Sequence, residues 1–216
     1  MDENGGATFV REIVLKSNFI LRIHQSAVGD VGCVVWDAAL VLIKFLEMDE
    51  FFNENGTHTM ENRTVLELGA GTGAVGLAAS VFGAEVTLTD LDDHVALMNK
   101  NIVANRSVCK GPVKAACLRW GQNVELAFPK PSYILCADCV YYDQSLEPLV
   151  KTINDLSNAE TIVLFCYEER IDKNELHIHF TKLIGKNFNI ERIPRERMHP
   201  QFCSPDLHIL KLTRRS

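Results

Sequence analysis

The residues between Glu67 and Gly76 are the part of the sequence best suited to bind a ligand. They read Glu-Leu-Gly-Ala-Gly-Thr-Gly-Ala-Val-Gly, and they follow a short apolar run and lead into a run of small, helix-forming residues. Glycines at such a turn let the backbone bend sharply and approach a ligand where a Cβ atom would collide. The stretch therefore predicts a loop that holds a nucleotide-like cofactor between a strand and a helix.

Two alignments of these glycines are possible, and they predict different cofactors. Gly71, Gly73 and Gly76 fit the G-x-G-x-x-G pattern of dinucleotide-binding folds. Glu67 and Gly69, followed by the first two of those glycines, fit acid-x-G-x-G-x-G, the arrangement used for S-adenosylmethionine. Glu67 favours the second alignment, because an acid is a poor neighbour for a pyrophosphate but suits the cationic methionine end of the methyl donor. An NAD-dependent oxidoreductase stays open as the alternative.

Asp90 supplies a second part of the expected cofactor site. It ends the next predicted strand, 19 residues after Gly71. A carboxylate at that place accepts hydrogen bonds from the two hydroxyls of an adenosine ribose. Because both candidate cofactors contain this ribose, Asp90 predicts adenosine binding without choosing between them.

Asp138 and Tyr141 are the expected substrate-facing residues. They follow a predicted strand in the middle of the chain, and the carboxyl ends of central parallel strands face the ligand in doubly wound sheets. Trp36 and Trp120 are the only tryptophans; one begins the first predicted helix and the other lies just beyond a strand. Either ring could stack on an adenine or line a channel for a methyl-accepting amine, although a lone tryptophan more often packs in a core.

No metal ion is expected. Cys136 and Cys139 form a C-x-x-C pair, but a zinc site needs a second pair or suitably spaced histidines. His177 and His179 are two residues apart on a predicted helix and so point in different directions. The 7 cysteines, an odd number placed within apolar stretches, are typical of reduced thiols in a cytoplasmic protein.

The elements that must position these residues alternate between strand and helix patterns. Two alternating segments, 9–15 and 19–24, predict an N-terminal β-hairpin, and an apolar helical stripe follows at 34–46. The rest of the chain predicts helices at 74–82, 93–105, 145–157 and 173–186 between strands at 64–68, 85–89, 113–118, 132–137, 161–167, 188–193 and 207–212. This order predicts an α/β, doubly wound, Rossmann-like fold with a mostly parallel seven-stranded sheet and helices on both faces.

The composition is that of one ordinary globular domain. The 216 residues are 47% hydrophobic and 23% charged, without a composition break, so residues 1–216 are expected to form a single domain. Within it, residues 1–8 are expected to be frayed and the hairpin and helix of residues 9–48 to pack on the core.

Charge and hydropathy indicate which partners to expect. The 28 acidic residues exceed the 22 Lys and Arg, which disfavours a nonspecific nucleic-acid binder. The start of the chain lacks a signal-peptide layout, and Asp37 and Lys44 interrupt the longest apolar stretch. A cytoplasmic monomer without a nucleic-acid or membrane partner is therefore expected.

The ordered set of motifs resembles the seven-strand (class I) S-adenosylmethionine-dependent methyltransferases and, more narrowly, the family-16 group of protein-lysine methyltransferases that modify chaperones and ATPases. The matching blocks are residues 34–39, 66–73, 89–90, 120–121 and 137–142. The resemblance implies cofactor contacts from Trp36, Gly69, Ala70, Gly71, Asp90, Trp120 and Ala137. The family's acid-x-x-aromatic signature falls on Asp138 and Tyr141. The implied substrate is a lysine on a protein, namely the valosin-containing hexameric ATPase or a related chaperone-like protein.

The implied reaction is in-line attack of a neutral lysine amine on the sulfonium methyl carbon. A free lysine has a pKa near 10.4, so only about one in two thousand is neutral at pH 7, and an apolar, aromatic channel that disfavours the ammonium is expected. Asp138 is assigned to orienting the amine and stabilising its developing charge, and Tyr141 to shaping the channel. A general-base role for Asp138 is disfavoured, because an exposed carboxylate is a poor match for an amine.

Three further alternatives stay open. A nucleic-acid amino-methyltransferase would be expected to carry Asn/Asp-Pro-Pro-Tyr/Phe where this chain has Asp138-Cys139-Val140-Tyr141. A methyltransferase acting on a small molecule and a non-catalytic cofactor-binding module are the others.

Overall fold

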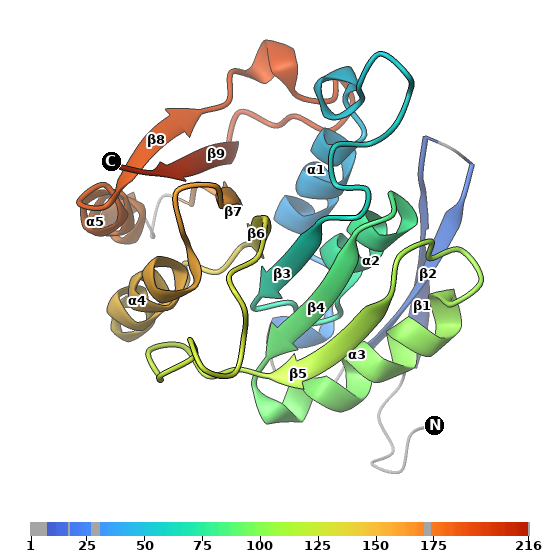
Figure 1. Cartoon of the computed structure of the whole chain (residues 1–216), viewed down its shortest axis with the longest axis horizontal. Helices are drawn as coiled ribbons and strands as arrows, with labels where there is room; N and C mark the ends of the chain where they lie inside the picture. Colours follow the sequence, from blue (N-terminus) through green and yellow to red (C-terminus); the bar gives the residue numbers. More distant parts are fainter. Residues whose placement is uncertain (1–7, 17, 27–30, 171–173, 216) are drawn as a thin grey trace.

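Alternating side chains along the central strands give the sheet two hydrophobic faces. The structure, a computed structural model, describes residues 8–16, 18–26, 31–170 and 174–215. Its seven-stranded sheet has the order β5-β4-β3-β6-β7-β9-β8, in which only the two pairings of β9 are antiparallel (Figure 1). The strands are β3 (Thr64–Leu68), β4 (Glu85–Asp90), β5 (Val113–Cys117), β6 (Tyr133–Ala137), β7 (Ile162–Glu168), β8 (Phe188–Arg192) and β9 (Leu207–Arg214). The predicted doubly wound, mostly parallel sheet is confirmed.

Helices cover both faces of this sheet. One face carries α1 (Asp37–Leu46), α2 (Ala74–Val81) and α3 (Asp92–Asn105), and the other carries α4 (Leu146–Leu156) and α5 (Asn174–Ile184). In β6, Leu135 joins the hydrophobic cluster under the first three helices, whereas Ile134 and Cys136 join the cluster under α4 and α5. Each fully buried aliphatic side chain contributes about 1.5–3 kcal/mol to the stability of the fold. Because strands covered on both faces bury successive side chains, their sequences are nearly continuous apolar runs.

Two asparagine side chains fasten the N-terminal hairpin to α3. The hairpin consists of β1 (Thr8–Val14) and β2 (Ile20–Ser26), which pair antiparallel as predicted. Asn101 accepts a hydrogen bond from the N–H of His24 (2.7 Å) and donates to its carbonyl (3.0 Å). Asn105 makes the same two bonds with the backbone of Arg22, at 2.8 and 2.9 Å. Asn101 also donates to the carbonyl of Thr72 in the glycine loop (2.9 Å). The outer edge of β2 is thus paired with a helix instead of another strand.

The start of the first helix differs from the prediction. α1 begins at Asp37, three residues later than the apolar stripe predicts, and Trp36 is its extended N-cap residue. The reason is that the Val35 N–H donates to the side-chain oxygen of Gln25 (2.7 Å), which holds this segment against the hairpin. Residues 1–7, predicted to be frayed, lie outside the described residues, and Thr8 already belongs to β1.

Short 3₁₀ segments connect some of these elements. They are η1 (Val31–Cys33), η2 (Asp49–Phe51), η3 (Asp143–Ser145) and η5 (Arg195–Arg197). Among the helices that the structure describes, none has the length and apolar character needed to cross a membrane.

Candidate functional site

One pocket lies at the carboxyl ends of β3, β4, β6 and β7. Because β3 lies between β4 and β6, this edge is the topological switch point at which doubly wound sheets bind ligands. The loop after β3, the end of β4, the residues after β6 and the segment before α1 all contribute to its wall. Nine of the predicted site residues line it: Trp36, Glu67, Gly69, Ala70, Gly71, Asp90, Ala137, Asp138 and Tyr141.

The glycine loop has conformations and contacts that exclude other residues. Gly69 and Gly71 have φ angles of +64° and +52°. A Cβ atom on Gly71 would lie 2.5 Å from the carbonyl oxygen of Gly32, and one on Gly69 would lie 2.9 Å from the Cys139 sulfur. The ring of Trp120 packs against Gly69 from behind, at 3.0 Å from the same Cβ position. In the described structure Trp120 does not line the pocket, so its cofactor contact stays a prediction.

The Asp90 carboxylate points at the glycine loop. Its Oδ2 accepts a hydrogen bond from the Gly71 N–H and its Oδ1 accepts one from the Leu91 N–H, both at 2.7 Å. A carboxylate offers about four acceptor positions, so two backbone bonds leave it able to accept the hydroxyls of a ribose. The bonds also fix the carboxylate beside the loop, which is where the spacing of the sequence predicted it.

Glu67 lies beneath the loop, at the first turn of α2. Its side chain is only 2% exposed, and its carboxyl group accepts a 2.7 Å hydrogen bond from the Gly76 N–H. Burial raises the pKa of Glu67 from 4.5 to about 8. The N–H groups of a first helical turn are the groups that a pyrophosphate would bind. Since Glu67 already takes one of them, the site fits a cofactor without phosphate better than it fits a dinucleotide.

Asp138 adopts a left-handed backbone conformation, with φ of 56°. Its N–H donates to the carbonyl of Cys166 (2.8 Å), so the turn after β6 is attached to β7. The side chain is 14% exposed, which corrects the expectation of an exposed carboxylate: the turn directs it toward the end of β7, where the Glu168 N–H lies 3.5 Å from Oδ1. Burial raises the pKa of Asp138, and the nearby Arg170 guanidinium opposes that rise.

Arg170 is a site residue that the sequence analysis missed. Its Nη2 lies 3.1 Å from Oδ2 of Asp138 and 2.7 Å from Oε2 of Glu168. Its Cζ lies 5.4 Å from the centre of the Trp36 ring, and the side chain lines the pocket. The sequence did contain a feature that could have identified Arg170, because this residue follows a predicted strand just as Asp138 does. In the structure these two strands, β6 and β7, are neighbours in the sheet.

His94 and Tyr142 also line the pocket and were not predicted as site residues. His94 is 6% exposed, with Nδ1 3.5 Å from Oδ1 of Asp90 and its ring packed against Gly32. It lies four residues after Asp90, in the first turn of α3, and this spacing could have identified it. Tyr142 packs edge-on against Tyr141, with ring centres 4.8 Å apart.

The two cysteines of the C-x-x-C pair lie in the core. Cys136 and Cys139 are both buried, and the Cys139 thiol donates to the carbonyl of Leu68 (3.2 Å). Over the residues that the structure describes, no group of three or more His, Cys, Asp or Glu side chains is placed to hold a metal ion.

Comparisons with solved structures agree with this architecture. The rRNA methyltransferase RsmC of T. Thermophilus, described in complex with AdoMet and guanosine, matches with a TM-score of 0.65 and 18% identity over 96% of this chain and 51% of that one. SMU.776, described in complex with SAH, matches with a TM-score of 0.59 and 14% identity over 95% of this chain and 56% of that one. At these identities the likeness shows the fold.

Comparisons of sequence are more specific. Protein N-lysine methyltransferase METTL21A of Danio rerio is 36% identical over 168 residues, which is 76% of this chain and 71% of that protein. EEF1A lysine methyltransferase 3 of Xenopus tropicalis is 32% identical over 197 residues, 90% and 81% of the two chains. The family model described as lysine methyltransferase matches residues 15–187, which include every residue of the pocket described above. The chain therefore belongs to the lysine methyltransferase family.

Proposed function

We propose that this chain methylates a lysine side chain of a protein, and that the protein is the valosin-containing hexameric ATPase or a related ATPase or chaperone. The observation that carries the proposal is the composition of one pocket. It combines the glycine loop and Asp90, the acid placed to bind a ribose, with the acid-x-x-aromatic pair Asp138 and Tyr141. Membership of the lysine methyltransferase family supports a lysine nitrogen as the acceptor.

The methyl donor is S-adenosylmethionine, as the family and the neighbours described with AdoMet or SAH indicate. When bound, it supplies a methyl carbon that forms a bond to the lysine nitrogen as its bond to sulfur breaks, the electron pair staying on sulfur and the amine proton leaving to water. The residues present fit this cofactor: Asp90 is available to ribose hydroxyls, and Glu67 occupies the Gly76 N–H that a phosphate-bearing cofactor would need.

The chain's own residues then have three tasks. The glycine loop and Asp90 hold the adenosine part, while Ala137 and Trp36 border the methionine part. Asp138 orients the incoming amine, and its carboxylate is fixed by partial burial and by the ion pair with Arg170. Tyr141 shapes the aromatic channel. Holding two reactants in line in this way can lower a barrier by roughly 7–11 kcal/mol, so positioning alone can account for much of the catalysis.

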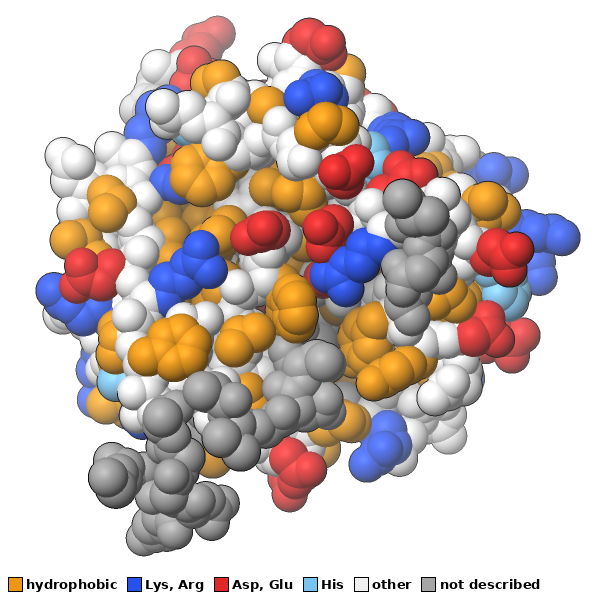
Figure 2. All heavy atoms as spheres, turned by 180° about the vertical axis from the view of Figure 1, so that it is seen from behind, with side chains coloured by type: hydrophobic (Ala, Val, Ile, Leu, Met, Phe, Trp, Pro, Cys, Tyr) orange, Lys and Arg blue, Asp and Glu red, His pale blue; other side chains and the backbone are white. Residues whose placement is uncertain are grey.

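The choice of target protein is supported by resemblance in three further blocks. Residues 32–36, 145–149 and 166–170 resemble the valosin-containing-protein lysine methyltransferase in particular. The net charge of −6 also favours a protein substrate over a nucleic acid. The described part of the face in Figure 2 agrees with this, because acidic, basic and hydrophobic side chains are mixed on it. A cytoplasmic location and a monomeric state are part of the same proposal.

The test is incubation of the purified chain with labelled S-adenosylmethionine and either the purified ATPase or a cell extract, followed by mass spectrometry. We expect methyl label on a lysine of the ATPase, and much less with the Asp138→Asn variant. Label on lysines of other proteins alone would reject the ATPase and keep lysine methylation. Label on RNA or a small metabolite would reject the substrate class.

A further inference from the structure

The immediate surroundings of Asp138 present a problem for the proposed reaction. A lysine must lose its proton before it can attack, yet a carboxylate beside it stabilises the ammonium form. Asp138 is not alone in this respect, because Glu168 lies at the end of the neighbouring strand with its N–H 3.5 Å from the Asp138 carboxylate. Two carboxylates with no balancing charge would hold an incoming lysine in its protonated, unreactive state.

Arg170 provides that balancing charge. Its guanidinium pairs with both acids, at 3.1 Å to Asp138 and 2.7 Å to Glu168, and it lies over the face of the Trp36 ring. A guanidinium stays protonated in proteins, so its charge does not change over the working pH range. The three side chains therefore form a network with one cation and two anions at the wall of the pocket.

We propose that Arg170 is a positioning residue for methyl transfer, which holds Asp138 in place and balances its charge so that the substrate lysine next to Asp138 can become an uncharged amine. The inference rests on the proposed lysine methylation and deepens it. In physical terms, the positive charge of Arg170 makes the substrate lysine easier to deprotonate. Arg170 is not part of the acid-x-x-aromatic signature.

The size of the effect follows from the distances. An amine within hydrogen-bonding reach of Asp138, about 3 Å, lies about 6 Å from the guanidinium. At an effective dielectric constant of about 20, one positive charge at that distance lowers the pKa of an amine by about 2. Because the Arg170 side chain is 35% exposed, solvent screening reduces this effect. We therefore expect Arg170 to lower the pKa of the substrate lysine by between about 1 and 2. The corresponding change in the neutral fraction of lysine is about 10-fold to 100-fold.

Other titratable groups face the same space and are present in every variant compared. A side-chain hydrogen bond with Cys136, together with burial, raises the pKa of the Cys139 thiol. Burial raises the pKa of the Cys166 thiol and, as described above, those of Glu67 and Asp138. Among the residues that the structure describes, the remaining groups that line the pocket or act on Asp138 are Asp37, Asp90, His94, Tyr141, Tyr142 and Glu168. Since the same groups are present in every variant, a difference between variants at residue 170 reports the contribution of the guanidinium, including its effect on the pKa of Asp138.

The experiment compares wild type, Arg170→Met and Arg170→Lys, with kcat measured from pH 6.5 to 10 at saturating donor and saturating acceptor protein. The kcat profile reports groups in the enzyme–substrate complex, which includes the bound lysine. For Arg170→Met we expect kcat near pH 7.5 to fall about 10-fold to 100-fold, and KM for the acceptor protein to stay equal or decrease. The midpoint of the kcat profile should move to a pH that is higher by about 1 to 2 pH units. Arg170→Lys keeps the charge and should keep the midpoint.

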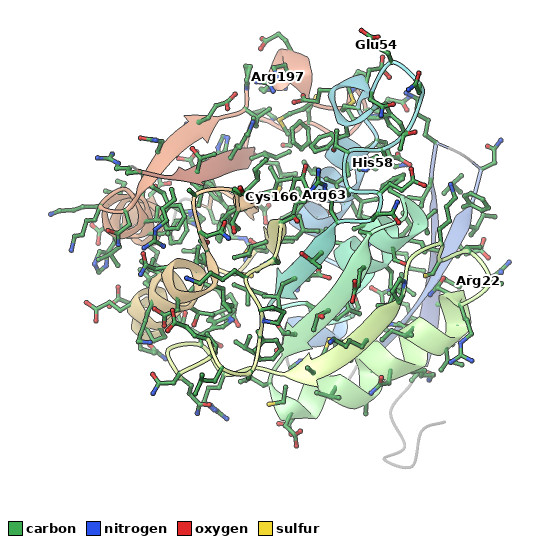
Figure 3. The ribbon with its side chains drawn as sticks, viewed as in Figure 1. Arg22, Glu54, His58, Arg63, Cys166 and Arg197 are labelled. Carbon is green, nitrogen blue, oxygen red and sulfur yellow. The ribbon has the colours of Figure 1, made fainter. Side chains whose placement is uncertain are left out.

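Two further variants strengthen the test. Arg197→Met is the matched control, because Arg197 also pairs with two acids, Glu50 and Glu191, but is not among the described residues that line the pocket (Figure 3). It should leave the midpoint unchanged. Adding Asp138→Asn to Arg170→Met removes the unbalanced negative charge, so the midpoint should return toward that of wild type although the rate stays low.

The outcomes separate this inference from the proposed function. A wild-type chain that labels no protein rejects the proposed function and the inference with it. Suppose that the wild type is active and that Arg170→Met has a lower kcat at every pH but the same profile midpoint. That result rejects the inference and keeps the proposed function. The same holds if the midpoint of Arg170→Lys shifts as far as that of Arg170→Met. If Arg170→Met does not fold, as judged by circular dichroism, Arg170→Gln serves for the same comparison.

Discussion

Replacing Glu67 by glutamine should remove a pH-dependent destabilisation of the folded chain. The side chain is 2% exposed, and burial raises its pKa from 4.5 to about 8. Between these two pH values the folded state binds one more proton at Glu67 than the unfolded chain does. The free energy of unfolding therefore decreases as the pH rises from about 4.5 to about 8. The pKa difference corresponds to about 5 kcal/mol at most.

Glutamine cannot ionise, and its oxygen can still accept the Gly76 N–H. Its amide N–H₂ group adds a constant cost of about 1–3 kcal/mol if it finds no acceptor, but this cost does not depend on pH. The informative quantity is the change with pH in the stability difference between variant and wild type. Going from pH 5 to pH 9, this difference should move in favour of Glu67→Gln by several kcal/mol, and by no more than about 5 kcal/mol.

The assay is urea denaturation of wild type and variant at pH 5, 6, 7, 8 and 9, followed by circular dichroism. Glu85→Gln is the control, because Glu85 is an exposed acid on the adjacent strand β4, and such a substitution should change stability by less than about 0.5 kcal/mol. Parallel pH profiles for wild type and Glu67→Gln would show that Glu67 has an ordinary pKa, and the account of its buried carboxyl group would be wrong.

The remaining predictions concern the pocket directly. Asp90→Ala removes the acceptor of the Gly71 N–H and should weaken S-adenosylmethionine binding at least tenfold by calorimetry; unchanged affinity would remove Asp90 from the ribose site. Asp138→Asn should lower the methylation rate more than donor affinity, so full turnover would make this acid purely structural. Gly71→Ala places a Cβ 2.5 Å from the Gly32 carbonyl oxygen at a φ of +52°, and should destabilise the chain by about 1–3 kcal/mol in thermal melts while abolishing donor binding. Wild-type stability for this variant would mean that the loop can rearrange.

Most secondary structure could be predicted because each central strand is a short apolar run between turn residues. The strand predicted at 64–68 has the bounds of β3, and the other predicted strands differ by one or two residues at their ends. The order of the strands could not be predicted in the same way. β9 lies between β7 and β8, and its apolar pattern would be the same beside any other neighbour.

The candidate site was predictable where a residue type and a strand end coincide. Gly69, Asp90 and Asp138 satisfy that condition, and all three line the pocket. Arg170 lies at a strand end as well, but a lone arginine is usually a solvated surface residue. Its role depends on the pairing with Asp138, and that pairing exists only because β6 and β7 are adjacent and Asp138 has a positive φ.

The attachment of the hairpin through Asn101 and Asn105 sets a limit on its length. Four residues of a helix advance about 6 Å, whereas two residues of a strand advance about 6.6 Å, so two amides match alternate residues of β2 closely. The mismatch grows with each further turn, and a longer strand held in this manner would lose alignment. Because Asn101 also bonds to Thr72, the same amide ties the hairpin to the glycine loop, and insertions in one segment would disturb the other.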